Sequence, residues 1–307
     1  MFRFKREQSV VNVGGIKLGG QPGENATVLC GTIFYQGHKI VQDEEQGAFD
    51  RAAAERLIAR QAELSEETGT PAVLHLYART IEALERYLAF ADLTWAGPII
   101  VDSADAAVRA GAAALVSELG YADKTIYNSI SVATSRMEAQ AIKESEVDSA
   151  ILLAYNPTDC RVDGMLQVLE GGAAMAEKGL IPLAEDLGIT NKLIDPGVVP
   201  MGSGAGASLR FSTVAKAKLA LPVGSGIHNA VSAWPWLRQK DKATKKCCDG
   251  AASAMQILAA GDFLLYGPIE NAEFIFPAAA MADILVAEAV RDLDNEPAAN
   301  HPIHRLV

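Results

Sequence analysis

"KTIYNSIS", residues 124–131, is predicted to form a short β-strand that becomes polar before it ends. Residues 125–127 favour a strand, but Asn128 and Ser129 follow where a buried strand would stay apolar. A buried amide without hydrogen-bond partners is costly. The strand is therefore expected to stop at an open edge of the fold, where Asn128 can meet a ligand.

Seven further apolar, β-branched runs occur along the 307 residues, separated by helical patterns. The eight predicted strands are 27–35, 72–78, 98–103, 125–131, 149–156, 192–198, 221–227 and 262–267. The clearest helical patterns are 50–69, 80–95 and 104–122, and Gly120 is expected to cap the last of them. Nearly continuous apolar strands are typical of a parallel sheet covered by helices.

Eight βα repeats without a linker predict a closed (β/α)8 TIM barrel, with residues 1–307 forming one α/β domain. The alternative is a doubly wound open sheet, which would need a glycine-rich phosphate loop after its first strand. Here the glycine-rich stretch 14–23 precedes that strand, and we expect a hairpin within residues 1–26 over the bottom or the mouth of the barrel. A second such stretch, 201–210, resembles a phosphate-binding turn, but its spacing matches no fingerprint and favours a plain loop.

Composition excludes several classes of protein. The net charge of −11 argues against nucleic-acid binding, because few basic groups are available to neutralise phosphates. The basic stretch 240–246 is either a solvated helix start or loop, or a patch for an anionic ligand tail or a protein partner. The four cysteines form neither a CxxC pair nor a zinc pattern, so no bound metal is expected. Without a signal peptide or an uncharged apolar span, we expect a cytoplasmic protein.

Polar residues follow several predicted strands at the barrel mouth, where the catalytic face of a parallel barrel lies. Asp102 follows "PIIV" and Asp195 follows "KLI", so each carboxylate must be solvated, paired or ligand-bound. A single strand-end Asp is often only a helix cap, as we expect for Asp105. Several polar strand-end side chains that converge, with Asn128 among them, would suit a flat polar heterocycle as ligand. A carboxylate can accept two N–H hydrogen bonds from a 2-amino-4-oxo pyrimidine ring.

These residues lie within motifs that carry a family resemblance. The motifs are "GGQPGENATVLCGTIFYQGHKIVQDEEQGAFD" (19–50), "PIIVDS" (98–103), "IYNSIS" (126–131), "NKLIDPGV" (191–198) and "PVGSGIHNAVSAW" (222–234). The chain resembles the family of the H subunit of tetrahydromethanopterin S-methyltransferase over essentially its whole length. Its wider relatives are cobalamin-dependent methyltransferases that act on methyltetrahydrofolate. The resemblance implies a pterin-binding (β/α)8 barrel, a homodimer, and methyl transfer between N5 of a tetrahydropterin and the cobalt of a corrinoid protein.

The resemblance also implies roles for individual residues. Asp102, Asp195 and Asn128 match the strand-end residues that hold the pterin ring, and Asn229 matches a later Asn near N5. Lesser candidates around the ring are Ser129, Asn156 and Gly224. The roles of three residues on the loop after the first barrel strand stay open: Tyr35, His38 and Glu45.

Cobalt is itself the nucleophile in such a transfer, so the protein need not supply one. N5 must instead change its protonation, and we expect Asn128, Asn229 and Asp195 to act there through hydrogen bonds and positioning. The corrinoid-binding pattern DxHxxG is absent from the sequence, so a separate corrinoid protein is expected to dock over the mouth.

The identity of the pterin and the reaction class stay open at this point. Tetrahydrofolate is favoured over tetrahydromethanopterin because of the soluble character of the chain. A dihydropteroate-synthase-like reaction on the same barrel would need a Lys/Arg pair for pyrophosphate, and the candidates are Arg210, Lys245 and Lys246. A non-catalytic subunit that only binds pterin is the third interpretation.

Overall fold

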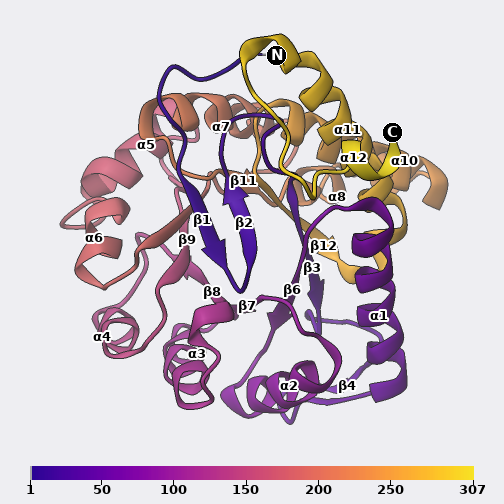
Figure 1. The fold of residues 1–307 in the computed structure, drawn as a ribbon. Coiled ribbons are helices and arrows are strands. Elements are labelled where there is room, and N and C mark those ends of the chain that lie inside the picture. Colours follow the sequence, from indigo (N-terminus) through magenta and orange to yellow (C-terminus); the bar gives the residue numbers. More distant parts are fainter. Residues whose placement is uncertain (1) are drawn as a thin grey trace.

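The computed structural model describes residues 2–307 and places eight parallel strands in one sheet, in the order β10-β9-β8-β7-β6-β3-β12-β11. A parallel bridge between Ile194 and Val223 joins the two ends of this sheet, which closes the barrel (Figure 1). The strands are β3 (Val28–Ile33), β6 (Ala72–Tyr77), β7 (Ile99–Asp102), β8 (Thr125–Ile130), β9 (Ser149–Leu153), β10 (Asn191–Asp195), β11 (Gly224–Ser225) and β12 (Phe263–Pro268). The predicted barrel and its eight strands are confirmed, and the open doubly wound sheet is wrong.

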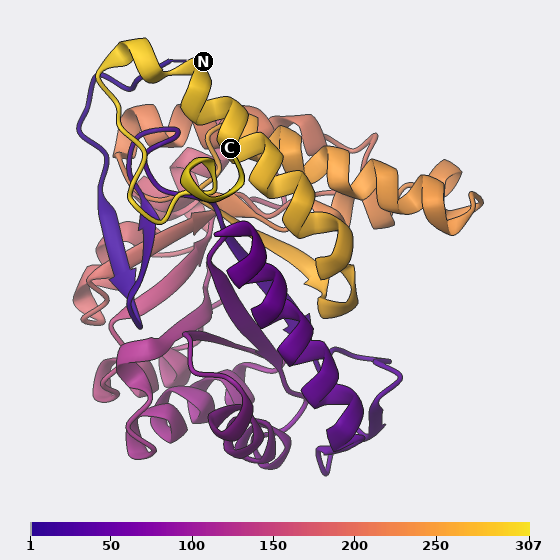
Figure 2. The ribbon, with the colours of Figure 1, turned by 45° about the vertical axis from the view of Figure 1, so that its right-hand side comes forward.

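Helices surround the strands on the outside of the barrel (Figures 1 and 2). They are α1 (Arg51–Thr68), α2 (Ile81–Thr94), α3 (Ala106–Glu118), α4 (Arg136–Glu144), α5 (Val162–Gly171), α6 (Leu180–Asp186), α7 (Ala205–Leu219), α8 (His228–Ser232), α9 (Pro235–Arg238), α10 (Lys242–Leu258), α11 (Ala272–Ala289) and α12 (Ile303–Leu306). Short 3-10 helices are η1 (Ala122–Lys124), η2 (Gly172–Ala174), η3 (Ile269–Asn271) and η4 (Arg291–Leu293). Asp105 caps α3 as predicted, and Gly120 follows that helix with a φ of 72° that favours glycine.

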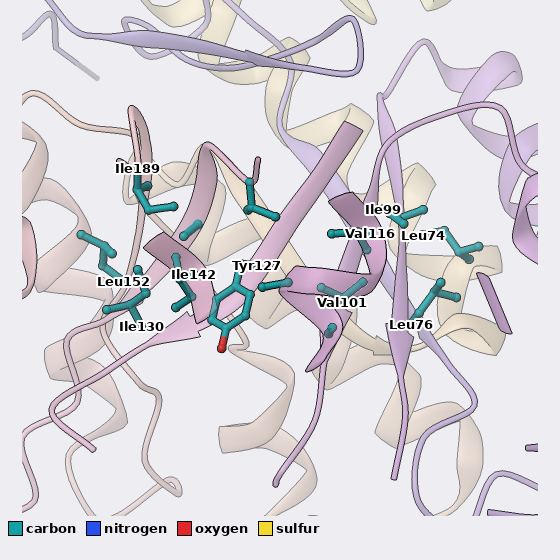
Figure 3. Close-up of a cluster of buried hydrophobic side chains, with 14 of the residues drawn as sticks. Leu74, Leu76, Ile99, Val101, Val116, Tyr127, Ile130, Ile142, Leu152 and Ile189 are labelled. Atoms are coloured by element: carbon teal, nitrogen blue, oxygen red, sulfur yellow. The ribbon is translucent and has the colours of Figure 1, made fainter. Parts of the chain in front are cut away.

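The outward-facing side chains of the strands form the larger core, which lies between the barrel and its helices. Tyr127 and Val101 lie on the strands, Val116 comes from α3 and Ile142 from α4 (Figure 3). All four side chains are at most 1% exposed. Because side chains alternate along a strand, the neighbours of these residues point into the barrel.

The lower half of the barrel interior is a second, apolar core. Each barrel strand from β3 to β10, together with β12, contributes inward residues to it: Val28, Cys30, Val73, Ile100, Ile126, Ile151, Leu193 and Phe263. An N-terminal hairpin of β1 (Val10–Val13) and β2 (Ile16–Gly19) packs Val11, Val13 and Leu18 against them. The backbone N–H of Gly14 at its tip donates to the carbonyl of Asp123, just before β8. The glycine-rich hairpin therefore covers the bottom of the barrel, not its mouth.

A second hairpin, β4 (Val41–Asp43) with β5 (Ala48–Phe49), lies in the connection after β3. Among the helices described within residues 2–307, none is both long enough and apolar enough to cross a membrane.

Candidate functional site

The upper half of the barrel interior is lined by polar side chains. Side chains two positions apart on a strand point to the same face, so each inward residue of the lower core is followed by one nearer the mouth. The lower-core residues in question are Val73, Ile100, Ile126 and Leu193. The residues two positions later are His75, Asp102, Asn128 and Asp195. Asp102 and Asn128 are direct neighbours, because their Cα atoms are paired across β7 and β8. Asp102 and Asn128 thus lie side by side, and Asp195 lies at the same end of the barrel, on the second strand beyond β8.

Asp102 is oriented by a chain of two hydrogen bonds. Its Oδ2 lies 3.0 Å from Nε2 of His75, and Nδ1 of His75 lies 3.0 Å from the hydroxyl of Thr32. With an ionised carboxylate and a neutral imidazole, Nε2 carries the proton and donates to Asp102, and Nδ1 accepts from the Thr32 hydroxyl. His75 is 5% exposed, whereas the Asp102 side chain is 25% exposed, so Asp102 presents its free oxygen to the mouth.

Asp195 lies at the end of β10 and is buried, with 6% of its surface exposed. One oxygen accepts a hydrogen bond from the backbone N–H of Gly197 at 2.7 Å. Burial raises the pKa of Asp195 from 3.8 to about 6, although the hydrogen bond from Gly197 opposes this shift. Because the folded protein solvates this carboxylate poorly, it is suited to accept hydrogen bonds from the N–H groups of a ligand.

Asn128 and Ser129 are partly exposed, whereas Tyr127 and Ile130 on either side of them are fully buried. The pairing of β8 with β9 shifts register between Asn128 and Ile130. Tyr127 and Ile130 consequently both belong to the outer core, and the amide and hydroxyl between them stay accessible. The peptide bond between Asn128 and Ser129 is cis.

Asn156 lies near the mouth, but the hydrogen bonds that its amide makes all lie within residues 156–164. The Nδ2 group donates to the carbonyl of Gly164, and Oδ1 accepts from Thr158 and from the backbone N–H of Asp159. The role that the structure shows is folding of the loop after β9. Its contact with pterin stays a prediction.

Gly224 and Asn229 lie around the end of β11. Gly224 is buried, and a Cβ atom added to it would lie 2.2 Å from the carbonyl oxygen of Phe263. The close packing of the two strands therefore requires glycine at this position. Asn229 is partly exposed at the start of α8, and its amide lies over Gly226. The contacts of Gly224 and Asn229 with pterin both stay predictions.

Tyr35, His38 and Glu270 form a cluster where β3 and β12 end. The Tyr35 hydroxyl donates to Oε1 of Glu270 at 3.1 Å, and Nε2 of His38 lies 3.1 Å from the same oxygen. The Tyr35 and His38 rings are stacked with centroids 4.2 Å apart. Burial opposes ionisation of Glu270, but the close contact with His38, a backbone N–H and the hydrogen bond from Tyr35 outweigh it and lower the pKa of Glu270. Glu45 is exposed, and its backbone carbonyl accepts a hydrogen bond from the Thr80 hydroxyl. This bond links the loop after β3 to the start of α2.

Sequence reasoning missed His75 and Thr32. Both lie inside predicted strands, two residues after an inward residue of the lower core. This spacing indicates that their side chains also point into the barrel. Within residues 2–307, no group of three or more His, Cys, Asp and Glu side chains is placed to hold a metal ion.

Solved structures of dihydropteroate synthases share this fold. The enzyme from Yersinia pestis with a pterin–sulfa conjugate has a TM-score of 0.60, is 13% identical and aligns over 93% of this chain and 100% of that chain. The enzyme from Xanthomonas albilineans in complex with 7,8-dihydropteroate has a TM-score of 0.55 and 17% identity over 92% of this chain and 98% of that chain. These likenesses define the class by fold alone: a (β/α)8 barrel of the dihydropteroate synthase type.

Sequence comparison defines the family within this class. The family model described as tetrahydromethanopterin S-methyltransferase MtrH subunit matches residues 6–298. A protein of Methanosarcina mazei, named as the H subunit of the putative methyltransferase mtx, is 50% identical over the full length of both chains. The H subunit of tetrahydromethanopterin S-methyltransferase of Methanocaldococcus jannaschii is 47% identical, again over the full length of both. The chain therefore belongs to the family of the tetrahydromethanopterin S-methyltransferase MtrH subunit, a family of methyltransferase subunits.

Proposed function

We propose that this chain binds a tetrahydropterin at the barrel mouth and transfers a methyl group between its N5 and the cobalt of a corrinoid that a partner protein delivers. Family membership supports methyl transfer and gives no support to a dihydropteroate-synthase-like reaction. Relatives of 46 to 47% identity are named for tetrahydromethanopterin, so we propose this pterin in place of the tetrahydrofolate that the sequence alone favoured.

The observation that carries the proposal is the layer of Asp102, Asn128 and Asp195 above an apolar floor. The 2-amino-4-oxo edge of a pterin offers adjacent N–H donors, which a poorly solvated carboxylate such as Asp195 accepts well. Asp102 offers a second acceptor whose direction His75 fixes. Asn128 can donate or accept, so it can follow a ring nitrogen through a change of protonation.

The reaction needs such a change at N5. When N5 is the acceptor, its lone pair forms the bond to the methyl carbon, the carbon–cobalt bond breaks with its electron pair left on cobalt, and N5 loses its proton to solvent. In the reverse direction, N5 leaves as a poor leaving group and must gain a proton. We propose that the Asn128 amide hydrogen-bonds N5 and strengthens this contact as charge develops. Asn229, near the start of α8, is the second candidate for this role.

The mouth is also the face at which the corrinoid protein would dock, because the β1–β2 hairpin covers the opposite end of the barrel. A homodimer remains our expectation for the assembly.

The test mixes the protein with a methylated corrinoid protein and tetrahydromethanopterin and follows the cobalamin spectrum. We expect wild type to convert the methylated to the reduced form, and Asn128→Ala to slow this at least about tenfold. Asn300→Ala, at an exposed residue remote from the strand ends, is the matched control. No spectral change with either tetrahydromethanopterin or tetrahydrofolate would overturn the proposed function. Wild-type rates in both Asn128→Ala and Asn229→Ala would overturn the role of the amides.

A further inference from the structure

A basic pocket lies beside the mouth, next to the ends of β11 and β12, the seventh and eighth barrel strands. Its volume is about 290 Å³, and its lining comes from helices α8, α9, α10 and α11 and from η3. The lining includes four basic residues, Arg238, Lys242, Lys245 and Lys246. Three of them belong to the basic stretch 240–246, to which the proposed methyl transfer assigns no role.

These four cations make no close ion pair among the described residues, although Lys246 lies near enough to Glu273 to help lower the pKa of that carboxyl. None of them forms an ion pair with a carboxylate among residues 2–307, in a chain whose net charge is −11. Asp249 is the one acidic residue of the lining, and its Oδ2 lies 2.7 Å from Nδ1 of His228. The pocket therefore gathers four cations beside one lining carboxylate, and none of the four is held in a close ion pair within residues 2–307.

The lysines lie near the N-terminal end of their helix, and the position of Lys242 is unfavourable. Helix α10 begins at Lys242, with Asp241 as its N-cap, and Lys245 and Lys246 lie in the next turn. The helix dipole repels a cation in the first turn of a helix, which applies here to Lys242. A bound anion would offset this repulsion.

The pocket lies at the same end of the barrel as the proposed ring site, beyond the ends of β11 and β12. His228 packs against Gly267 near the end of β12, where an added Cβ would lie 2.5 Å from its Cδ2. The loops after the last two strands are a frequent phosphate site in barrels of this type. One wall is apolar, formed by Val231, Leu237 and Phe274, and Lys246 lies 5.2 Å over the Phe274 ring. This combination suits a chain with apolar segments and anionic groups.

We propose that this basic pocket binds the anionic tail of the tetrahydropterin, through its carboxylate or phosphate groups. The inference rests on the proposed function, since the ring must occupy the mouth for its tail to reach the pocket. The ring site would supply recognition of the pterin, and the pocket would supply affinity for the complete coenzyme.

The test compares tetrahydromethanopterin with the tail-less 6-methyltetrahydropterin by calorimetric titration. The variant is the triple substitution Lys242→Gln, Lys245→Gln and Lys246→Gln. The matched control neutralises three exposed lysines elsewhere, Lys5, Lys17 and Lys143. We expect the pocket variant to weaken tetrahydromethanopterin binding roughly 10- to 100-fold and to flatten its salt dependence. Its affinity for 6-methyltetrahydropterin should stay within about twofold of wild type.

Three results would overturn the tail pocket. The first is unchanged affinity for tetrahydromethanopterin in the pocket variant. The second is an equal loss for both pterins, which would show a structural effect. The third is unchanged pterin affinity together with weaker binding of the corrinoid protein, which would assign the pocket to that protein. Failure of wild type to bind either pterin would instead overturn the proposed ring site, and the tail pocket with it.

Discussion

The two halves of the barrel interior are built from the same strands but differ in chemistry. Below, Val73, Ile100 and Ile126 meet the N-terminal hairpin in a closed apolar core. Two residues further along the same strands, the side chains are His75, Asp102 and Asn128. The lower half contributes hydrophobic burial, whereas the upper half keeps polar groups partly unpaired. This difference is what we expect if the polar strand ends serve the proposed ligand at the expense of stability.

Phe263→Ala in the lower half is expected to have the largest effect on stability. Phe263 is 1% exposed, and its truncation leaves a cavity in a packed core. The free energy of unfolding should fall by about 3–5 kcal/mol, with methyl transfer by the folded fraction changed only a few-fold. Urea unfolding measures this, with Leu93→Ala at a 75% exposed leucine as control. Loss of activity in fully folded Phe263→Ala would break the comparison.

Asp195→Asn in the upper half is expected to act in the opposite direction. A pKa raised from 3.8 to about 6 means that the ionised carboxylate costs on the order of 3 kcal/mol in the folded protein. The variant should therefore be more stable than wild type at pH 8, by up to that amount, and should lose pterin binding by about 100-fold. Chemical unfolding and pterin titration give both values. A variant that is less stable and still active would show that Asp195 is structural.

The pH dependence sharpens the same contrast. The folded-state pKa of Asp195 lies above its unfolded value, so the destabilisation is present above about pH 6 and disappears as pH falls toward 3.8. The stability difference between wild type and Asp195→Asn should shrink over this window. Pterin affinity of wild type should fall below about pH 6, because the protonated carboxyl accepts fewer N–H bonds. Pterin affinity that is constant from pH 5 to 8 would contradict an ionised Asp195 in the complex.

His75→Phe is expected to have a smaller effect. It keeps a ring of similar volume but removes the donor that orients Asp102, so pterin affinity should fall about tenfold. Thr32→Val removes only the outer bond of the chain and should cost about two- to threefold. Titration of the two variants gives this order. Equal affinities in both variants and wild type would show that Asp102 needs no orientation.

Much of the fold followed from the sequence. Nearly continuous apolar runs predicted all eight barrel strands, and strand ends pointed to Asp102, Asn128 and Asp195. His75 was missed because a histidine within an apolar strand resembles core until its inward direction is known. The place of the β1–β2 hairpin depends on contacts with Asp123 and the strand starts, which local pattern does not contain.

Loop residues were harder to interpret for a physical reason. Asn156 is of a residue type that often binds ligands, but the path of its loop determines that it hydrogen-bonds Gly164 and Thr158. Gly224 is required by the approach of Phe263 on the neighbouring strand, which sequence spacing does not show. Tyr35 and His38 meet Glu270 across more than 230 residues of chain, so only the closed barrel reveals their cluster.

The most direct test of the polar upper half is equilibrium titration of tetrahydromethanopterin into wild type and into the double variant Asp102→Asn, Asn128→Ala. These two side chains are paired across β7 and β8, and both are partly exposed at the mouth. We predict that the double variant keeps its circular dichroism spectrum and binds the pterin at least about 100-fold more weakly than wild type. Equal affinity in the two proteins would contradict a pterin site at the barrel mouth.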